Sequence, residues 1–198
     1  MVDGGPHHVE AMRAEVTAAL SPLGLRLAPE KTHTVHLNEG FDFLGFHIRR
    51  QRKRGTQKYY VYTTPSKKAI QKVKDKVKAK TYRSTRHQDL DKMITSLNRS
   101  LRGWANYFRY GVSKAVFSAV DSHTWYRLMR WIRNKYKGKN RLGMKQFQRR
   151  FCDQGWKITH HGVTFTGASS VAVTRYRYRG STIPTPWTPT PATATTSG

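Results

Sequence analysis

The chain has 198 residues, a formal net charge of +26 at pH 7 and a single cysteine, Cys152. A charge this large favours a polyanionic partner, above all nucleic acid. No apolar run of 18 residues is available to span a membrane, and one cysteine cannot form an internal disulfide. Residues 1–46 carry six acidic and three basic side chains, whereas residues 47–198 carry five acidic and 34 basic side chains. We therefore expect a separate basic zone after residue 46.

The start of the chain lacks the basic and apolar regions of a secretory signal. Together with the lone thiol, this predicts a cytoplasmic protein. His160 and His161 follow Cys152 in the sequence, but these residues do not have the paired ligand spacing that zinc sites use. We expect no metal site and no cofactor.

The first 63 residues predict a helix and a β-hairpin. Apolar residues at helical spacing indicate a short amphipathic helix over 7–23. A turn around Pro29 follows, and alternation predicts a strand over 33–37. The aromatic alternation over 41–48 predicts a second strand, which pairs in a hairpin with 59–62.

A lysine-rich helix is predicted from Thr64 to Lys80. Thr64 suits the N-cap, and Pro65 suits the first helical position. Asp75 alone cannot offset repulsion among lysines spaced i, i+4, so helix stability does not favour this lysine pattern. A nearby phosphate backbone would favour the pattern. The alternative is a helix whose lysines only make the surface soluble. The predicted contacts are Lys67, Lys68, Lys72 and Lys76.

The next helix, predicted from Gln88 to Gly111, has an apolar face and an arginine-rich face. The apolar face comprises Leu90, Ile94, Leu97, Leu101, Trp104 and Phe108. The predicted nucleic-acid contacts on the other face and at the helix end are Arg99, Arg102, Asn106, Arg109 and Tyr110, and arginine is the side chain best suited to phosphate. Alone, this face is also consistent with simple solvation, and only the neighbouring basic helices favour binding. We assign Trp104 to the core rather than to RNA stacking.

A third helix is predicted from Ser113 to about Lys137. Its broad apolar arc indicates burial on more than one side. The predicted nucleic-acid contacts on its remaining face are Tyr126, Arg130, Arg133 and Lys137. Three helices of this kind are expected to pack as a small antiparallel bundle.

The C-terminal part predicts a short helix over 144–151 and short strands over 156–159, 162–166 and 171–178. The last of these alternates arginine and tyrosine, a pattern that suits either RNA stacking or a half-buried edge strand. The Pro- and Thr-rich tail, 181–198, predicts disorder.

Two blocks near the N-terminus and one further along resemble a known family. The pattern Leu27-x-x-Glu30-Lys31-Thr32, followed by Gly40-Phe41-x-Phe43-Leu44-Gly45-Phe46, is similar to the closing blocks of a group II intron reverse transcriptase. The segment from Leu97-Asn98-Arg99 to Tyr110 resembles the maturase-specific region of that family, also called domain X. The resemblance spans roughly residues 7–187.

The resemblance implies particular roles. Lys31 would lie near the incoming nucleotide, and the block Phe43, Leu44, Gly45 and Phe46 would correspond to the primer grip. The full-length family polymerises DNA with Mg²⁺ held by an Asp-Asp pair. No Asp-Asp occurs in this sequence. We therefore expect the C-terminal portion of such a protein, which arises from a truncated gene, a split gene or a misassigned start and is not an enzyme on its own.

The expected fold is α+β and mainly α: a small helical bundle preceded by a palm-remnant helix and hairpin, with short strands near the C-terminus. The expected domains are 1–63, the palm end; 64–180, the thumb and maturase-specific region; and 181–198, the tail. The leading hypothesis is a maturase-type domain that binds group II intron RNA and assists its splicing. One alternative is the thumb half of a split RNA-directed DNA polymerase, active only with a palm- and fingers-bearing partner. The other is a generic basic RNA-binding protein.

Overall fold

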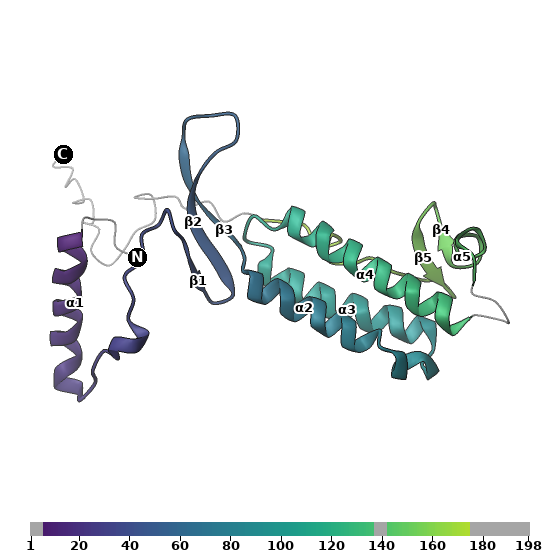
Figure 1. Cartoon of the computed structure of the whole chain (residues 1–198), viewed down its shortest axis with the longest axis horizontal. Coiled ribbons are helices and arrows are strands. Elements are labelled where there is room, and N and C mark those ends of the chain that lie inside the picture. The colour runs from purple at the N-terminus through teal and green to yellow at the C-terminus, as the bar shows by residue number, and fades with distance from the viewer. Residues whose placement is uncertain (1–5, 137–141, 175–198) are drawn as a thin grey trace, which may run out of the picture. The chain divides into compact units, whose positions relative to one another are not determined.

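A computed structural model describes residues 6–136 and 142–174. Within these residues the protein is α+β and mainly helical, as predicted. The chain divides into two compact units, residues 1–72 and 73–198, which we call the N-terminal unit and the C-terminal unit. The division falls inside helix α2, Lys67–Lys80 (Figure 1). Lys137, the alternating segment beyond Thr174 and the tail lie outside the described residues.

The N-terminal unit begins with helix α1, Pro6–Leu20, and two 3₁₀ turns, Ser21–Leu23 and Pro29–Lys31. The strand predicted over 33–37 is wrong, because this segment is irregular and ends in a turn. The amides of Glu39 and Gly40 both donate to the carbonyl of His36. Such a turn ends any extended ladder.

The strand predicted over 41–48 is two strands. Leu44 and Gly45 have φ values of 46° and 81°, a left-handed pair that forms a tight hairpin turn. The turn joins β1, Phe41–Phe43, to β2, Phe46–Arg52. Strand β2 pairs antiparallel with β3, Tyr59–Pro65, which confirms the predicted hairpin and lengthens it.

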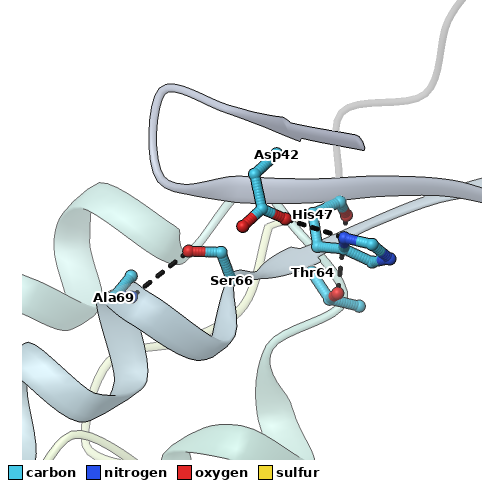
Figure 2. A network of polar contacts seen from close by, with 5 residues as sticks. All are labelled: Asp42, His47, Thr64, Ser66 and Ala69. Atoms are coloured by element: carbon cyan, nitrogen blue, oxygen red, sulfur yellow. Dashed lines mark hydrogen bonds and ion pairs between the residues drawn. The ribbon is translucent and has the colours of Figure 1, made fainter. Parts of the chain in front are cut away.

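Helix α2 starts later than predicted, and its cap is Ser66 rather than Thr64. The amide of Ala69 donates to Ser66 Oγ over 3.2 Å, while Thr64 belongs to β3 and donates to the carbonyl of His47 at 3.5 Å (Figure 2). Asp42 Oδ1 lies 2.8 Å from His47 Nδ1 across the β1–β2 pair, and a dashed line in Figure 2 marks this contact. The strand continues through Pro65 because β2 offers it a partner as far as Phe46.

The C-terminal unit contains the predicted helical bundle. After α2 come a 3₁₀ turn, η3, Arg83–His87, and helices α3, Leu90–Phe108, and α4, Lys114–Lys135 (Figure 1). The buried apolar residues of these helices include Val73, Val77, Leu90, Met93, Ile94, Leu97, Leu101, Ala105, Phe108, Phe117, Val120, Leu128, Trp131 and Ile132. The predicted apolar faces therefore form this core.

Trp104 is half-buried on the inner side of α3. Its ring lies 4.9 Å from Phe108 and 5.5 Å from Phe117, measured between ring centroids. These contacts agree with its assignment to the core. Its indole N–H is buried without a hydrogen-bond partner among the described residues.

A small sheet and one more helix complete the C-terminal unit. Helix α5, Met144–Phe151, has the predicted bounds. Strands β4, Cys152–Asp153, β5, Lys157–His160, and β6, Val163–Thr164, form an antiparallel sheet. Phe147, Phe151 and Ile158 join the core from these elements.

Asn98 ties this sheet to α3. Its Nδ2 donates to the carbonyl of Thr164 over 2.8 Å, and its Oδ1 accepts from the amide of Thr166 over 3.0 Å. The asparagine of the Leu97-Asn98-Arg99 motif is therefore structural, because both ends of its amide bind the main chain of a segment 66 residues away.

Asp121, on α4, binds the segment that follows the small sheet. Its two carboxylate oxygens accept from the amides of Ala168, over 2.6 Å, and Ser169, over 2.8 Å. Gly167, with φ +69°, precedes them, and a Cβ there would come within 2.5 Å of the Asp121 carboxylate. This close approach requires glycine on both grounds.

The N-terminal unit differs from the C-terminal unit in burial. Between His7 and Thr64 every described residue is exposed or half-buried. Large apolar side chains face solvent, including Leu23 at 72% exposure and Leu44 at 69%. Within its described residues, this unit therefore has almost no apolar core.

Candidate nucleic-acid interface

The outer face of α3 carries the arginines predicted from the sequence. Arg99, Arg102 and Asn106 are all exposed, because Leu97 and Leu101 on the opposite face are fully buried and fix the rotation of the helix. Within the described residues no hydrogen bond or ion pair engages these three polar side chains. Lys92 on the same helix differs, since it pairs with Asp89 over 3.0 Å. The donors of Arg99 and Arg102 are therefore available to an anionic ligand.

Arg109, at the end of α3, is already partly engaged. Its Nη2 donates to Thr174 Oγ1 over 3.1 Å, and its carbonyl accepts from the amide of Thr174. Its guanidinium carbon lies 5.5 Å from the ring centroid of Tyr110, which is 57% exposed. Tyr110 is thus the more accessible of the two predicted contacts.

On α4, the predicted contacts fall into two groups. Tyr126 is 63% exposed and Arg130, one turn later, is also exposed. Arg133 is half-buried and its Nε donates to the carbonyl of Leu142 over 2.7 Å. This hydrogen bond secures the segment before α5, so part of the Arg133 guanidinium has a structural role.

The predicted lysine contacts of α2 are all exposed. Lys67, Lys68 and Lys72 belong to the N-terminal unit, and Lys76 belongs to the C-terminal unit. Lys80 is different, because its Nζ donates to Ser96 Oγ on α3. The exposed lysines present charge without fixed geometry, as a nonspecific contact to phosphates requires.

An aromatic pocket of about 540 Å³ lies between α4 and the C-terminal sheet. Its aromatic lining consists of Trp125, Tyr126, Trp156 and Phe165. The Trp125 indole donates to the carbonyl of Trp156 over 2.8 Å, and the two rings meet edge to face. Sequence reasoning missed Trp156, which is 50% exposed, although tryptophan in a basic region was a usable signal. Exposed aromatic rings of this kind stack on unpaired RNA bases.

One cluster of possible metal ligands occurs among the described residues. The donor atoms of Asp91, His160 and His161 lie within 4.8 Å of one another. Burial and the neighbouring His161 lower the pKa of His160, the Asp91 carboxylate raises it, and the positive charge of Arg150 lowers it. The sequence did not predict this cluster. Asp91 is on α3, and the two histidines are at the end of β5 and directly after it, so they become neighbours only when the sheet packs against α3. The absence of a metal site stays a prediction.

The residues that resemble the palm end lie in the N-terminal unit. Lys31 is exposed at the end of its 3₁₀ turn. Phe43, 58% exposed, precedes the Leu44-Gly45 turn, and half-buried Phe46 follows it. The four primer-grip-like residues thus form one hairpin tip.

The lowered pKa values of two histidines in the C-terminal unit lead us to expect a decline in stability at mildly acidic pH. Burial, aided by the charges of Lys74 and Arg127, lowers the pKa of His123, and burial likewise lowers that of His160. The unfolded chain therefore binds more protons than the folded chain below the ordinary histidine pKa of 6.5. We expect the free energy of unfolding to be highest above this pH and to fall as pH decreases below it. Urea unfolding at pH 7.5 and 5.5 measures the change.

The control for this expectation is the His123→Gln/His160→Gln variant, which cannot titrate at these positions. Its decline between the two pH values should be smaller than that of the unchanged chain. An equal decline in both proteins would show that other groups cause it.

The C-terminal unit is a basic helical bundle with exposed arginines, an arrangement typical of nucleic-acid-binding domains. Residues 70–151 match the group II intron, maturase-specific domain, which confirms the predicted resemblance to the C-terminal region of group II intron maturases. Protein YkfC of Escherichia coli (strain K12) is 41% identical over 70 residues. This alignment covers 35% of the chain and 18% of YkfC, so the chain spans a small part of that relative.

None of the described helices is both long and apolar enough for a membrane span.

Proposed function

We propose that this protein binds structured group II intron RNA through its maturase-specific region and assists the splicing of that RNA. The observation that carries the proposal is that Arg99 and Arg102 on α3, inside residues 70–151, are exposed and have no partner among the residues that the structure describes. Guanidinium groups bind phosphates in bidentate geometry, and the lysines of α2 add nonspecific attraction. The aromatic pocket that Tyr126 helps to line adds a surface on which unpaired bases can stack.

In this proposal the protein acts by binding, and the intron RNA supplies the splicing chemistry, as the resemblance implies. The protein therefore needs no catalytic residue and no cofactor of its own, and it works in the cytoplasm. The contacts that we propose are Arg99, Arg102, Asn106, Arg109, Tyr110, Tyr126, Arg130, Arg133, Lys137, Lys67, Lys68, Lys72 and Lys76.

The test is protection of a candidate intron RNA from nuclease by the unchanged chain and by the Arg99→Ala/Arg102→Ala variant. Loss of two charge-assisted contacts, each contributing about 1.5 kcal/mol, should weaken binding roughly 100-fold. Lys145→Ala/Arg149→Ala is the matched control, since it removes two exposed charges from α5 and should change affinity little. Equal protection by all three proteins would remove the proposed face. Equal binding of an unrelated RNA of the same length would instead favour the generic RNA-binding alternative.

A second candidate function is the thumb half of a split RNA-directed DNA polymerase. It is favoured by the lack of buried residues between His7 and Thr64, since exposed apolar surface of this kind marks an interaction site. The partner would carry the fingers and the Asp-Asp palm. Such a partner should bind the chain and make RNA-templated DNA synthesis depend on both polypeptides. Synthesis by the purified chain alone would contradict this candidate, because the candidate makes synthesis depend on the partner.

A further inference from the structure

A second basic site lies where the end of α2, the η3 turn and helix α4 meet. It is a pocket of about 180 Å³, smaller than the roughly 300–1,000 Å³ of pockets that hold drug-sized ligands. Its described lining consists of four arginines with Thr81, Tyr82, Trp131 and Asn134; the arginines are Arg83, Arg86, Arg127 and Arg130. No carboxylate is among these lining residues. A concave site lined by charges of one sign concentrates its field on a counter-ion.

Part of the pocket is held rigidly. The Arg127 guanidinium donates from Nε to Thr81 Oγ1 over 3.1 Å and from Nη2 to the carbonyls of Lys78 and Thr81, each over 3.3 Å. Thr81 is only 6% exposed, so this arginine is anchored to the buried end of α2. Its charge is therefore fixed in place before any ligand arrives.

The floor and the rim are also built into the fold. Trp131 is 2% exposed, and its indole N–H donates to Thr85 Oγ1 over 3.1 Å. Lys135 Nζ donates to the carbonyl of Arg86 over 2.8 Å, which secures the η3 turn against α4. These contacts hold the Arg86 main chain beside the pocket, and they leave the Arg86 guanidinium available to bind an anion.

The other three guanidinium groups have no fixed partner. Arg83 and Arg130 are exposed and Arg86 is half-buried. Within the described residues, no hydrogen bond or ion pair engages any of these side chains. Like charges gathered in this way repel one another, so the arrangement is stabilised when an anion lies between them.

We propose that this pocket binds a single phosphate group. Guanidinium forks match the oxygens of a phosphate, and the fixed Arg127 together with the three unengaged arginines can surround a tetrahedral oxyanion. The assignment of the phosphate to RNA rests on the proposed function, whereas binding of inorganic phosphate does not. The pocket is distinct from the α3 face, because none of Arg99, Arg102 and Asn106 lines it.

The experiment compares phosphate binding by the unchanged chain, by Arg83→Gln/Arg86→Gln, which changes two pocket arginines that are not among the RNA contacts proposed above, and by the control Lys145→Gln/Arg149→Gln. Inorganic phosphate should raise the melting temperature of the unchanged chain and of the control more than chloride does at equal ionic strength, because a ligand that binds the folded state stabilises it. The pocket variant should bind phosphate at least tenfold more weakly. An equal rise in all three proteins, or a rise no larger than with chloride, would overturn the proposal.

A second measurement does not depend on any variant. In the unchanged chain, phosphate should shift the NMR signals of the arginine Nε–H groups that line the pocket and leave that of Arg149 unchanged. Uniform shifts of all arginine signals would overturn the proposal even if the pocket variant failed to fold.

The source of the phosphate is tested with two RNA oligonucleotides of one sequence, one with a 5′-phosphate and one with a 5′-hydroxyl. Tighter binding of the first, lost in the pocket variant, assigns the pocket to a terminal phosphate. Equal binding of both, weakened in the pocket variant, assigns it to an internal phosphodiester. Phosphate binding without RNA binding would overturn the proposed function alone, whereas RNA binding that is unaffected by the pocket variant would remove RNA as the source of the phosphate.

Discussion

Gly167→Ala should destabilise the C-terminal unit by roughly 3 kcal/mol or more. The new Cβ would lie within 2.5 Å of the Asp121 carboxylate, at a residue whose φ of +69° already disfavours alanine. Displacing that carboxylate breaks its hydrogen bonds from the amides of Ala168 and Ser169, each worth about 1.5–3 kcal/mol because one partner is charged. Urea unfolding followed by circular dichroism measures the loss of stability.

Gly103→Ala is the matched control for this substitution. Gly103 lies on the exposed face of α3, and a Cβ there meets no atom within 4 Å among the described residues. Alanine is the better helix former, so this variant should be more stable by up to about 1 kcal/mol. A similar loss of stability in both variants would mean that the contact between Asp121 and the segment after Gly167 is not important.

The affinity for intron RNA should fall about 10³-fold or more between 50 and 200 mM salt. The proposed contacts are mostly lysine and arginine side chains, and each phosphate that they neutralise releases condensed counterions. The slope of log K against log salt concentration should be smaller in magnitude by about 2 for Arg99→Ala/Arg102→Ala, since two phosphate contacts are lost. Filter binding over a series of salt concentrations measures both quantities.

For this measurement Lys92→Ala is an informative control. Lys92 is on α3 like the two arginines, but its charge is already paired with Asp89. Its removal should leave the slope nearly unchanged. An affinity insensitive to salt would contradict phosphate binding by any of these faces.

The helices were predictable because their hydrophobic period is strong and continuous. The apolar face of α3 and the bounds of α5 follow from spacing alone. The errors lie where local and non-local effects compete. Ser66 rather than Thr64 caps α2 because pairing with β2 keeps Thr64 in a strand, and the Leu44-Gly45 turn interrupts an otherwise convincing alternation.

The site was only partly predictable for the same reason. An arginine face on one helix is visible in its sequence, so Arg99 and Arg102 could be chosen. The arginine pocket could not, because it joins η3 to α4, some 40 residues apart, and Arg127 points inward only through its bonds to Thr81. Asn98 belongs to a recognisable motif, but its structural role depends on a strand far along the chain.

The scarcity of buried residues between His7 and Thr64 has a consequence for how the molecule opens. Protection of a main-chain amide from hydrogen exchange with solvent depends on the free energy needed to expose it. The β2–β3 ladder is regular but half-exposed or exposed throughout, apart from Pro65, so its amides should exchange through local opening. The amides of Leu97 and Leu101, inside a closed core, should exchange only when the C-terminal unit unfolds as a whole. The amides of the chain thus fall into a fast-exchanging class in the N-terminal unit and a slow-exchanging class in the C-terminal unit. A polypeptide that covers the N-terminal unit would slow hydrogen exchange in the fast class alone.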